Sequence, residues 1–274
     1  MNYQRQLSIS AWNVRGLGDK HTDDFFLSKI KSDINILLET WKGETQETKI
    51  EGYVSITKCR NKHKRSKRHS GGIIIYIKKI IFKGITYLSK DTLSPNRAWL
   101  KLDKKFFGLK KHLFVCAVYV PPQNSVHYND DFLDLESEVT KFSADGDITL
   151  IGDFNARTGN SADFIENDSD NINIFQEFLP PDYDNDNCIL RNNVDKTINS
   201  HGKELLNLCV SSRLRILNGR YLGDFLGHYT CYTTNRDSTV DYAIVNDSLQ
   251  SSVNFFCTSE LNYLSDHVQI YIMC

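Results

Sequence analysis

The chain has 274 residues, of which 40% are hydrophobic and 11% aromatic, so it can bury one large core. Its 33 Lys and Arg residues are balanced by 34 Asp and Glu residues, which gives a formal net charge of -1. This balance excludes a protein that holds nucleic acid by overall positive charge, and any polyanion must therefore meet a local basic patch.

The cysteines and the N-terminus indicate the compartment. Seven cysteines occur without any CxxC spacing, which predicts neither a zinc site nor a disulfide framework. The first residues lack the apolar segment of a signal peptide, and no apolar run approaches the roughly 18 residues that a membrane span requires. We expect an intracellular protein, nuclear or cytoplasmic, with no membrane partner. No repeat or linker divides the chain, so residues 1–274 are predicted to form one domain.

Short β-rich runs recur along the chain, with a few helical patterns between them. Several of these runs are apolar on both faces, which is typical of central strands covered on both sides. Many strands with few helices favour an α/β sandwich with mixed sheets over a regular βαβ alternation. The predicted strands are 7–13, 34–39, 71–78, 97–103, 112–120, 147–155, 238–245 and 266–273, and the predicted helices are 22–31, 128–142 and 201–212.

Two stretches have unusual charge. Residues 58–69 contain seven Lys or Arg, and their Lys64, Arg65, Lys67 and Arg68 are candidate DNA contacts, although such a run also fits a solvated loop or a nuclear-import signal. Residues 158–190 contain eight acids and no Lys or Arg, which predicts a long, irregular polar connection.

Polar side chains stand where several apolar strands begin or end. Buried without partners, such charges cost several kcal/mol, so they must meet one another, a metal ion or solvent in a cleft at the strand ends. A cluster of oxygen ligands suits Mg²⁺, with Mn²⁺ as an alternative, and an added histidine suits phosphodiester hydrolysis. The residues concerned are Asn13, Glu39, Asp153, Asn155, Asp241, Asp266 and His267.

Six strings carry a family resemblance. In chain order they are WNVRGL (12–17), ILLET (36–40), VYVPP (118–122), GDFNA (152–156), STVDYAIV (238–245) and SDH (265–267). Each alone fits an ordinary turn or strand end, but together they resemble the apurinic-type endonuclease domain of LINE-like non-LTR retrotransposons, over about residues 7–273. This domain belongs to the endonuclease/exonuclease/phosphatase superfamily with DNase I, which implies a four-layer α/β sandwich of two mixed β-sheets packed face to face with helices outside.

The resemblance also implies a metal site and a DNA surface. Glu39 would be the principal ligand of Mg²⁺, with Asn13 beside it and Asp266 near the ion or its waters. Arg15 would contact a phosphate. The segment 221–237, with Tyr229 and Thr230, would lie against the DNA, although it also fits a hairpin that packs its own aromatic residues.

The remaining matched residues would carry the reaction. Asp153 would orient and deprotonate the attacking water, and Asn155 would donate to the scissile phosphate. His267 would act as a cation on the developing charge, with Asp241 holding its ring. Tyr119 would contact the phosphate or the leaving oxygen.

The predicted function is metal-dependent nicking of one strand of duplex DNA to leave a 3′-hydroxyl, by a monomer that acts with a reverse transcriptase in cis or in trans. An abasic-site repair endonuclease or a small-molecule phosphoesterase of the same superfamily is the first alternative. The strings at 155–157 and 239–242 favour nucleic acid over a small molecule. A non-catalytic binding scaffold is the second alternative, which the presence of Glu39, Asp153 and His267 disfavours.

Overall fold

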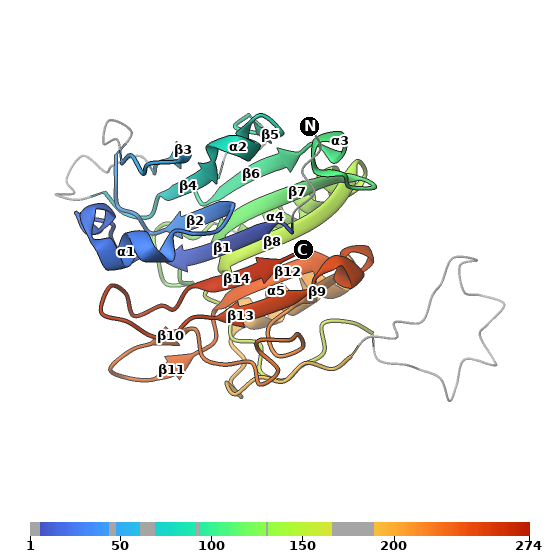
Figure 1. Cartoon of the computed structure of the whole chain (residues 1–274). Coiled ribbons are helices and arrows are strands. Elements are labelled where there is room, and N and C mark those ends of the chain that lie inside the picture. Colours follow the sequence, from blue (N-terminus) through green and yellow to red (C-terminus); the bar gives the residue numbers. More distant parts are fainter. Residues whose placement is uncertain are drawn as a thin grey trace, which may run out of the picture.

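Two six-stranded β-sheets form the centre of the structure, a computed structural model that describes residues 6–43, 48–60, 69–90, 92, 94–129, 131–165 and 189–274. The first sheet has the strand order β13-β14-β1-β2-β4-β3, and the second has the order β5-β6-β7-β8-β12-β9 (Figure 1). The first sheet contains β1 (Ser8–Asn13), β2 (Ile34–Leu38), β3 (Tyr53–Lys58), β4 (Ile73–Lys78), β13 (Phe255–Thr258) and β14 (Ile270–Met273). The second contains β5 (Ile85–Tyr87), β6 (Arg97–Leu102), β7 (His112–Tyr119), β8 (Gly146–Asp153), β9 (Leu214–Ile216) and β12 (Asp241–Asn246).

Both sheets are mixed. In the first, β1 and β2 run parallel, and in the second β7 and β8 run parallel, while the other neighbours are antiparallel. A separate two-stranded sheet joins β10 (Cys231–Tyr232) to β11 (Asp237–Ser238). This arrangement confirms the predicted α/β sandwich of mixed sheets.

Alternating side chains of the central strands explain why the two sheets pack together. In β2, Ile36 and Leu38 point into the core between the sheets, where Ala117 of β7 and Ile151 of β8 meet them from the other side. Leu37, between them in the chain, belongs to the cluster on the outer face of the first sheet. Strands that are apolar on both faces therefore have both faces covered, as their sequence predicted.

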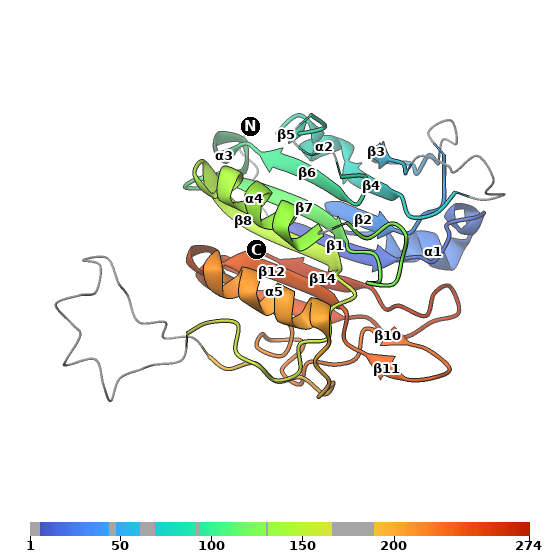
Figure 2. The same cartoon turned by 180° about the vertical axis from the view of Figure 1, so that it is seen from behind.

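The outer faces of the two sheets are covered unequally. On the second sheet, α4 (Asp131–Ser143) and α5 (Ser200–Ser211) lie side by side across β8 and β12 (Figure 2). The first sheet is covered by the six-residue α1 (Asp24–Lys29), through Phe26, and by connecting segments that include Leu264. The described residues also form the helices α2 (Lys79–Phe82) and α3 (Lys104–Phe107), with 3₁₀ turns at Lys20–Thr22 and Asp247–Ser252.

A buried polar network fixes α4 on the second sheet. The Arg97 guanidinium of β6 donates through Nε to Glu138 Oε2 of α4 at 2.9 Å, and Trp99 Nε1 donates to the same oxygen at 2.7 Å. Arg97 also contacts Asp131 at the start of α4. A buried guanidinium requires such partners, so the register between strand and helix is fixed by charge as well as by packing.

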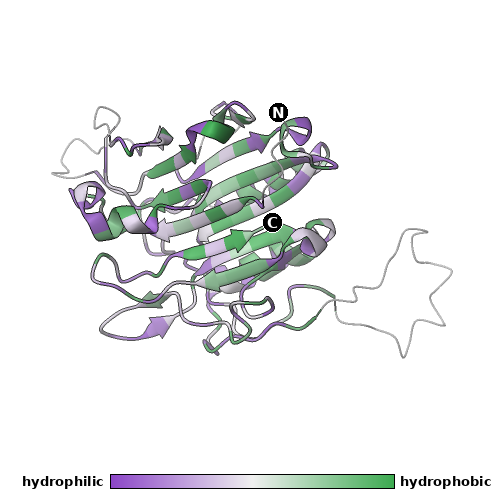
Figure 3. Ribbon diagram, viewed as in Figure 1, coloured by the Kyte–Doolittle hydropathy of each residue, from purple (hydrophilic) through white to green (hydrophobic). Residues whose placement is uncertain are grey.

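The predicted elements are all present, with bounds that differ by a few residues. The predicted strand 238–245 begins only at Asp241, and the strand predicted over 266–273 begins at Ile270. Short or half-exposed strands were not predicted, among them β3, β5, β9 and β13. Hydropathy follows the layers: the sheets are largely hydrophobic, and hydrophilic residues concentrate in the connections (Figure 3). Within the described residues, no helix combines the length and the apolar character needed to cross a membrane.

Candidate active site

The predicted catalytic and metal-binding residues lie at one edge of the sandwich because the parallel strands end there. Asn13 is the last residue of β1, and Glu39 directly follows β2. In the second sheet, Tyr119 ends β7 and pairs with Asp153, which ends β8. Asp153 pairs in turn with Asp241, the first residue of the antiparallel β12. The strand register therefore places Tyr119, Asp153 and Asp241 next to one another on three adjacent strands.

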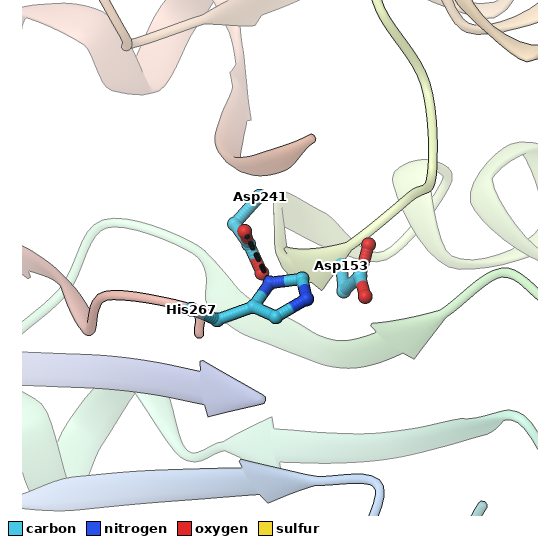
Figure 4. Close-up of side chains that lie close together, drawn as sticks. All are labelled: Asp153, Asp241 and His267. Carbon is cyan, nitrogen blue, oxygen red and sulfur yellow. Dashed lines mark hydrogen bonds and ion pairs between the residues drawn. The ribbon is translucent and has the colours of Figure 1, made fainter. Parts of the chain in front are cut away.

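His267 completes this cluster from the segment before β14. Its Nδ1 lies 2.9 Å from Asp241 Oδ2, and its backbone oxygen accepts a hydrogen bond from Trp12 Nε1 at 2.8 Å. The ligand atoms of Asp153, Asp241 and His267 all lie within 4.8 Å of one another. Figure 4 shows the imidazole ring between the two carboxylates.

Asn13 joins this cluster to Glu39. Its Nδ2 donates to Asp153 Oδ2 at 2.9 Å and to Glu39 Oε1 at 3.2 Å. Asn13 is 1% exposed, so its hydrogen bond to Asp153 is buried, while the one to the half-buried Glu39 is partly buried. The predicted convergence of Glu39, Asp153 and His267 is therefore what the structure shows, although they come from segments separated by more than a hundred residues.

Burial and neighbouring charges shift the pKa values of this cluster. Burial, followed by the negative charge of Asp241, raises the pKa of Asp153 to about 7, although the charge of His267 opposes the rise. Burial alone lowers the pKa of His267, but the charge and hydrogen bond of Asp241 hold it well above 6.5. The site thus pairs a carboxylate that can take up a proton near neutral pH with an imidazole that is already cationic.

Tyr119 faces the Glu39 side of the site. Burial, followed by the charges of Glu39 and Asp153, raises the pKa of its phenol, which therefore stays protonated and able to donate. The Arg60 guanidinium lies over its ring, with its Cζ 5.8 Å from the ring centroid. A guanidinium in this position adds positive charge next to a group of carboxylates.

Asn155 follows Asp153 in a strained loop. Its backbone has a φ of +47°, and its N–H donates to Asp153 Oδ1 at 2.9 Å. Its side-chain Nδ2 donates to the Val120 carbonyl at 2.9 Å. An amide NH₂ has two hydrogens, so the second remains for another acceptor.

The predicted metal ligands fit a hard cation. Glu39 supplies carboxylate oxygens, and Asn13 directs its amide NH₂ toward them while its own Oδ1 accepts a hydrogen bond from the Arg15 N–H at 3.0 Å. Asp266 has a buried Oδ1 with no hydrogen-bond partner among the described residues. Its other oxygen pairs with Arg15. An unpartnered buried carboxylate oxygen beside a carboxylate cluster is what a divalent cation would satisfy. Among the described residues, however, the group that meets a purely geometric criterion for metal ligands is Asp153, Asp241 and His267, which were predicted as catalytic.

The structure places the predicted DNA-contacting residues in different environments. Arg15 keeps 62% of its side chain exposed at the rim of the site, and Tyr229 is half-buried against Tyr232. Thr230 is fully buried, and its hydroxyl accepts hydrogen bonds from the N–H groups of Val240 and Asp241 at 3.0 Å. Its side chain positions the Asp241 strand and is not accessible to DNA, which corrects that prediction. Lys64, Arg65, Lys67 and Arg68 lie outside the described residues.

Backbone geometry singles out residues of this site, among them Trp41, which was not predicted from the sequence. The described part of the chain has five non-glycine residues with positive φ, and four of them lie at this site: Arg15, Glu39, Trp41 and Asn155. Such conformations cost about 1–3 kcal/mol each and cluster at functional sites. Sequence reasoning missed Trp41 and Arg60, which directly contact the predicted site residues Glu39 and Tyr119, because no sequence pattern distinguishes them from ordinary packing residues.

Comparisons with known proteins give the family of the chain and confirm its fold. The model of a family described as endonuclease-reverse transcriptase matches residues 113–271, more than half of the chain. The AP endonuclease LMAP from Leishmania major has a TM-score of 0.69 and 14% identity, over 98% of this chain and 87% of that chain. The catalytic domain of APE2 from Xenopus laevis has a TM-score of 0.64 and 15% identity, over 97% of this chain and 91% of that chain. The endonuclease domain of TRAS1, a telomere-specific non-LTR retrotransposon, has a TM-score of 0.59 and 13% identity, over 98% of each chain. No match was found among curated proteins.

Proposed function

The chain belongs to the endonuclease-reverse transcriptase family of the endonuclease/exonuclease/phosphatase superfamily, and on this premise we propose that it is a metal-dependent endonuclease that nicks one strand of duplex DNA and leaves a 3′-hydroxyl. One observation carries the proposal. Asp153, Asp241 and His267 form a cluster with ligand atoms within 4.8 Å, and Asn13 connects it to Glu39. Such a set supplies the base, the cation and the metal ligands that phosphodiester hydrolysis needs.

Asp153 is the proposed general base. Its raised pKa, caused by burial and by Asp241, lies near neutral, where a base is both deprotonated often enough and basic enough to take a proton from water. Hydrogen bonds from Asn13 Nδ2 and from the Asn155 N–H fix its two oxygens. The carboxylate is therefore held in one orientation toward the attacking water.

His267 is the proposed cation at the phosphate. Asp241 occupies its Nδ1, so Nε2 is the ring atom that would donate to the phosphate oxygens as their charge grows. The second amide hydrogen of Asn155 and the hydroxyl of Tyr119 would donate to the same group. Fixed donors of this kind stabilise a transition state because they need no reorganisation during the reaction.

Glu39, Asn13 and Asp266 are the residues that would hold the divalent cation, for which Mg²⁺ is the first candidate and Mn²⁺ the alternative. When bound there, the ion would act as a Lewis acid that neutralises charge on the phosphate and the leaving oxygen. Arg15, exposed at the rim beside Asp266, would contact a neighbouring phosphate of the duplex.

The proposed cellular setting follows from the family. A 3′-hydroxyl at a nick is the primer that a reverse transcriptase extends, so we propose such an enzyme as a partner, either in the same polypeptide or in trans. The chain is proposed to act as a monomer in the nucleus or cytoplasm.

A second candidate is cleavage at abasic sites, which the likeness to LMAP and to APE2 favours because the first is an AP endonuclease by name. A small-molecule phosphoesterase and a non-catalytic scaffold have no comparable observation in their favour. Abasic and intact duplexes therefore belong in the same assay.

The test is nicking of supercoiled plasmid in Mg²⁺ and in EDTA. We expect nicking in Mg²⁺ alone, and polymerase extension of the product would demonstrate the 3′-hydroxyl. Asp153→Asn and His267→Ala should each reduce the rate by about 10²–10⁴-fold, the range that acid–base groups and fixed donors contribute. Asp33→Asn is a matched control, since Asp33 is buried and paired with Lys78 away from the site. Nicking that persists in EDTA contradicts the proposal. So do rates in Asp153→Asn and His267→Ala that equal the rate of the unaltered protein.

A further inference from the structure

Trp41 contacts the carboxylate of Glu39 directly. Its indole Nε1 donates to Glu39 Oε2 at 3.2 Å, while Asn13 Nδ2 donates to Oε1 at 3.2 Å. Each oxygen of the carboxylate thus accepts from a side-chain N–H, and the Tyr119 hydroxyl is a further hydrogen-bonding neighbour of Glu39. A carboxylate offers about four acceptor positions, so a position remains for a cation.

The backbone around Trp41 is held in a conformation that the side chains alone would not favour. Glu39 has a φ of +50° and Trp41 a φ of +54°. Two hydrogen bonds to neighbouring glycines hold this turn, from Trp41 N to the Gly71 carbonyl at 2.9 Å and from Thr40 N to the Gly72 carbonyl at 3.2 Å. Two strained residues within three positions indicate that the surrounding structure determines where both side chains point.

The indole ring is also fixed from the side of β1. A Cβ at Gly16 would lie 2.5 Å from Trp41 Cε3, and Gly16 has a φ of +87°. The Gly16 N–H donates to the Glu39 carbonyl at 2.7 Å. The turn after β1 therefore packs against both the ring of Trp41 and the backbone of Glu39. This close packing explains why the string WNVRGL has a glycine at position 16.

We propose that Trp41 is a positioning residue that orients the Glu39 carboxylate for a divalent cation. This inference rests on the proposed function in one respect, namely that Glu39 is a metal ligand. Hydrogen bonds at both oxygens restrict rotation of the carboxylate, so a cation meets a preformed ligand. Removal of a donor to a metal ligand typically lowers metal affinity about 10–100-fold.

The chain contains a matched control for this hydrogen bond. Trp99 also donates its indole Nε1 to a glutamate, Glu138, at 2.7 Å, but on the α4 side of the second sheet. Trp41→Phe and Trp99→Phe therefore remove the same kind of donor from the same kind of acceptor. Phenylalanine keeps an aromatic ring in each place, so it preserves most of the packing while it removes the hydrogen bond.

The experiment measures binding of Mn²⁺ alone, through the electron paramagnetic resonance signal of the free ion, on the full chain without DNA. We expect the Kd of the Trp41→Phe variant to rise about 10–100-fold, and that of the Trp99→Phe variant to stay within twofold of the unaltered protein. Paramagnetic Mn²⁺ should also quench the fluorescence of Trp41, and this quenching should be reduced in Trp41→Phe, which retains Trp12 and Trp99.

Equal Mn²⁺ affinity in Trp41→Phe and the unaltered protein overturns the inference and leaves Trp41 a packing residue. Should Trp41→Phe fail to fold, the unaltered protein decides the question, because absence of quenching by Mn²⁺ contradicts a cation at Glu39. Absence of plasmid nicking together with an affinity loss specific to Trp41→Phe would instead reject the proposed endonuclease and keep the positioning role.

Discussion

Asp241 sets the charge state of His267. The two residues lie 26 positions apart, and their 2.9 Å contact is buried, with 11% and 3% of the His267 and Asp241 side chains exposed. Burial disfavours the imidazolium, but the neighbouring carboxylate outweighs it and raises the pKa of His267. The stability that this pair contributes is therefore fully present below pH 6.5, the usual pKa of histidine, and is lost as the pH rises through the raised value.

Replacing Asp241 by Asn should reverse this effect. Burial then remains while the main opposing charge is removed, so the pKa of His267 should fall, and nicking should decline at a lower pH than in the unaltered protein. NMR titration of the His267 ring and a pH–rate profile measure the two effects. Asp33→Asn serves as the control, and an unchanged His267 titration in Asp241→Asn would show that the charge of Asp241 does not govern the histidine.

At the scale of elements, the glycine before Asp153 is required by the strands that carry the site. Gly152 of β8 pairs with Val118 of the parallel strand β7, and a Cβ there would lie 2.0 Å from the Val118 carbonyl oxygen. Its φ of +146° is one that other residues rarely adopt. The glycine of GDFNA thus lets β7 and β8 approach closely just before Asp153.

Gly152→Ala should consequently reduce both stability and nicking. We expect a loss of about 3 kcal/mol or more, since backbone strain and the steric overlap add together. Gly18→Ala is the comparison, because Gly18 also has a positive φ, +46°, but open space around it, so about 1–2 kcal/mol is expected. Urea unfolding measures both losses, and equal losses would show that the contact with Val118 does not matter.

Sequence reasoning located the elements that have strong apolar patterns and missed the others. The strands β2, β4 and β8 are long apolar runs and were predicted, whereas β3 has half-exposed and exposed residues and β9 has three residues. Edge position and shortness remove the pattern on which such prediction depends. The site shows the same dependence, because the predicted site residues are those that follow strands with a clear apolar pattern.

The contacts between site residues needed three-dimensional information. Trp41 is defined by positive φ angles and by space beside Gly16, neither of which has a sequence pattern of its own. Thr230 was assigned to the DNA surface because the family resemblance implies that its segment lies against the DNA, but its hydroxyl accepts hydrogen bonds from backbone N–H groups at the start of β12 in the interior. A hydroxyl residue in a loop has the same sequence signature in both roles.

At the scale of the whole molecule, the two sheets share one core. Side chains of β1, β2 and β4 interdigitate with those of β6, β7 and β12 in a single buried cluster. Neither sheet can expose its inner face without exposing that of the other, so the two should unfold together.

Single-tryptophan variants can measure this cooperativity. Trp12 lies in β1 of the first sheet and Trp99 in β6 of the second, so variants that retain one or the other report on one sheet each. We expect the fluorescence midpoints in urea to coincide with each other and with the circular dichroism of the same variant. Midpoints that differ between the two probes would indicate two folding units and contradict the predicted single domain.

The pairing of Tyr119, Asp153 and Asp241 across three strands has a consequence for how the protein acquires its activity during folding. A slip of β12 by one position against β8 would turn every side chain of β12 to the opposite face. Asp241 would then point away from His267, although the strand would still be hydrogen-bonded and the molecule still compact. The pairing register of β8 and β12 during folding therefore decides whether a newly made molecule is active or is compact but inactive.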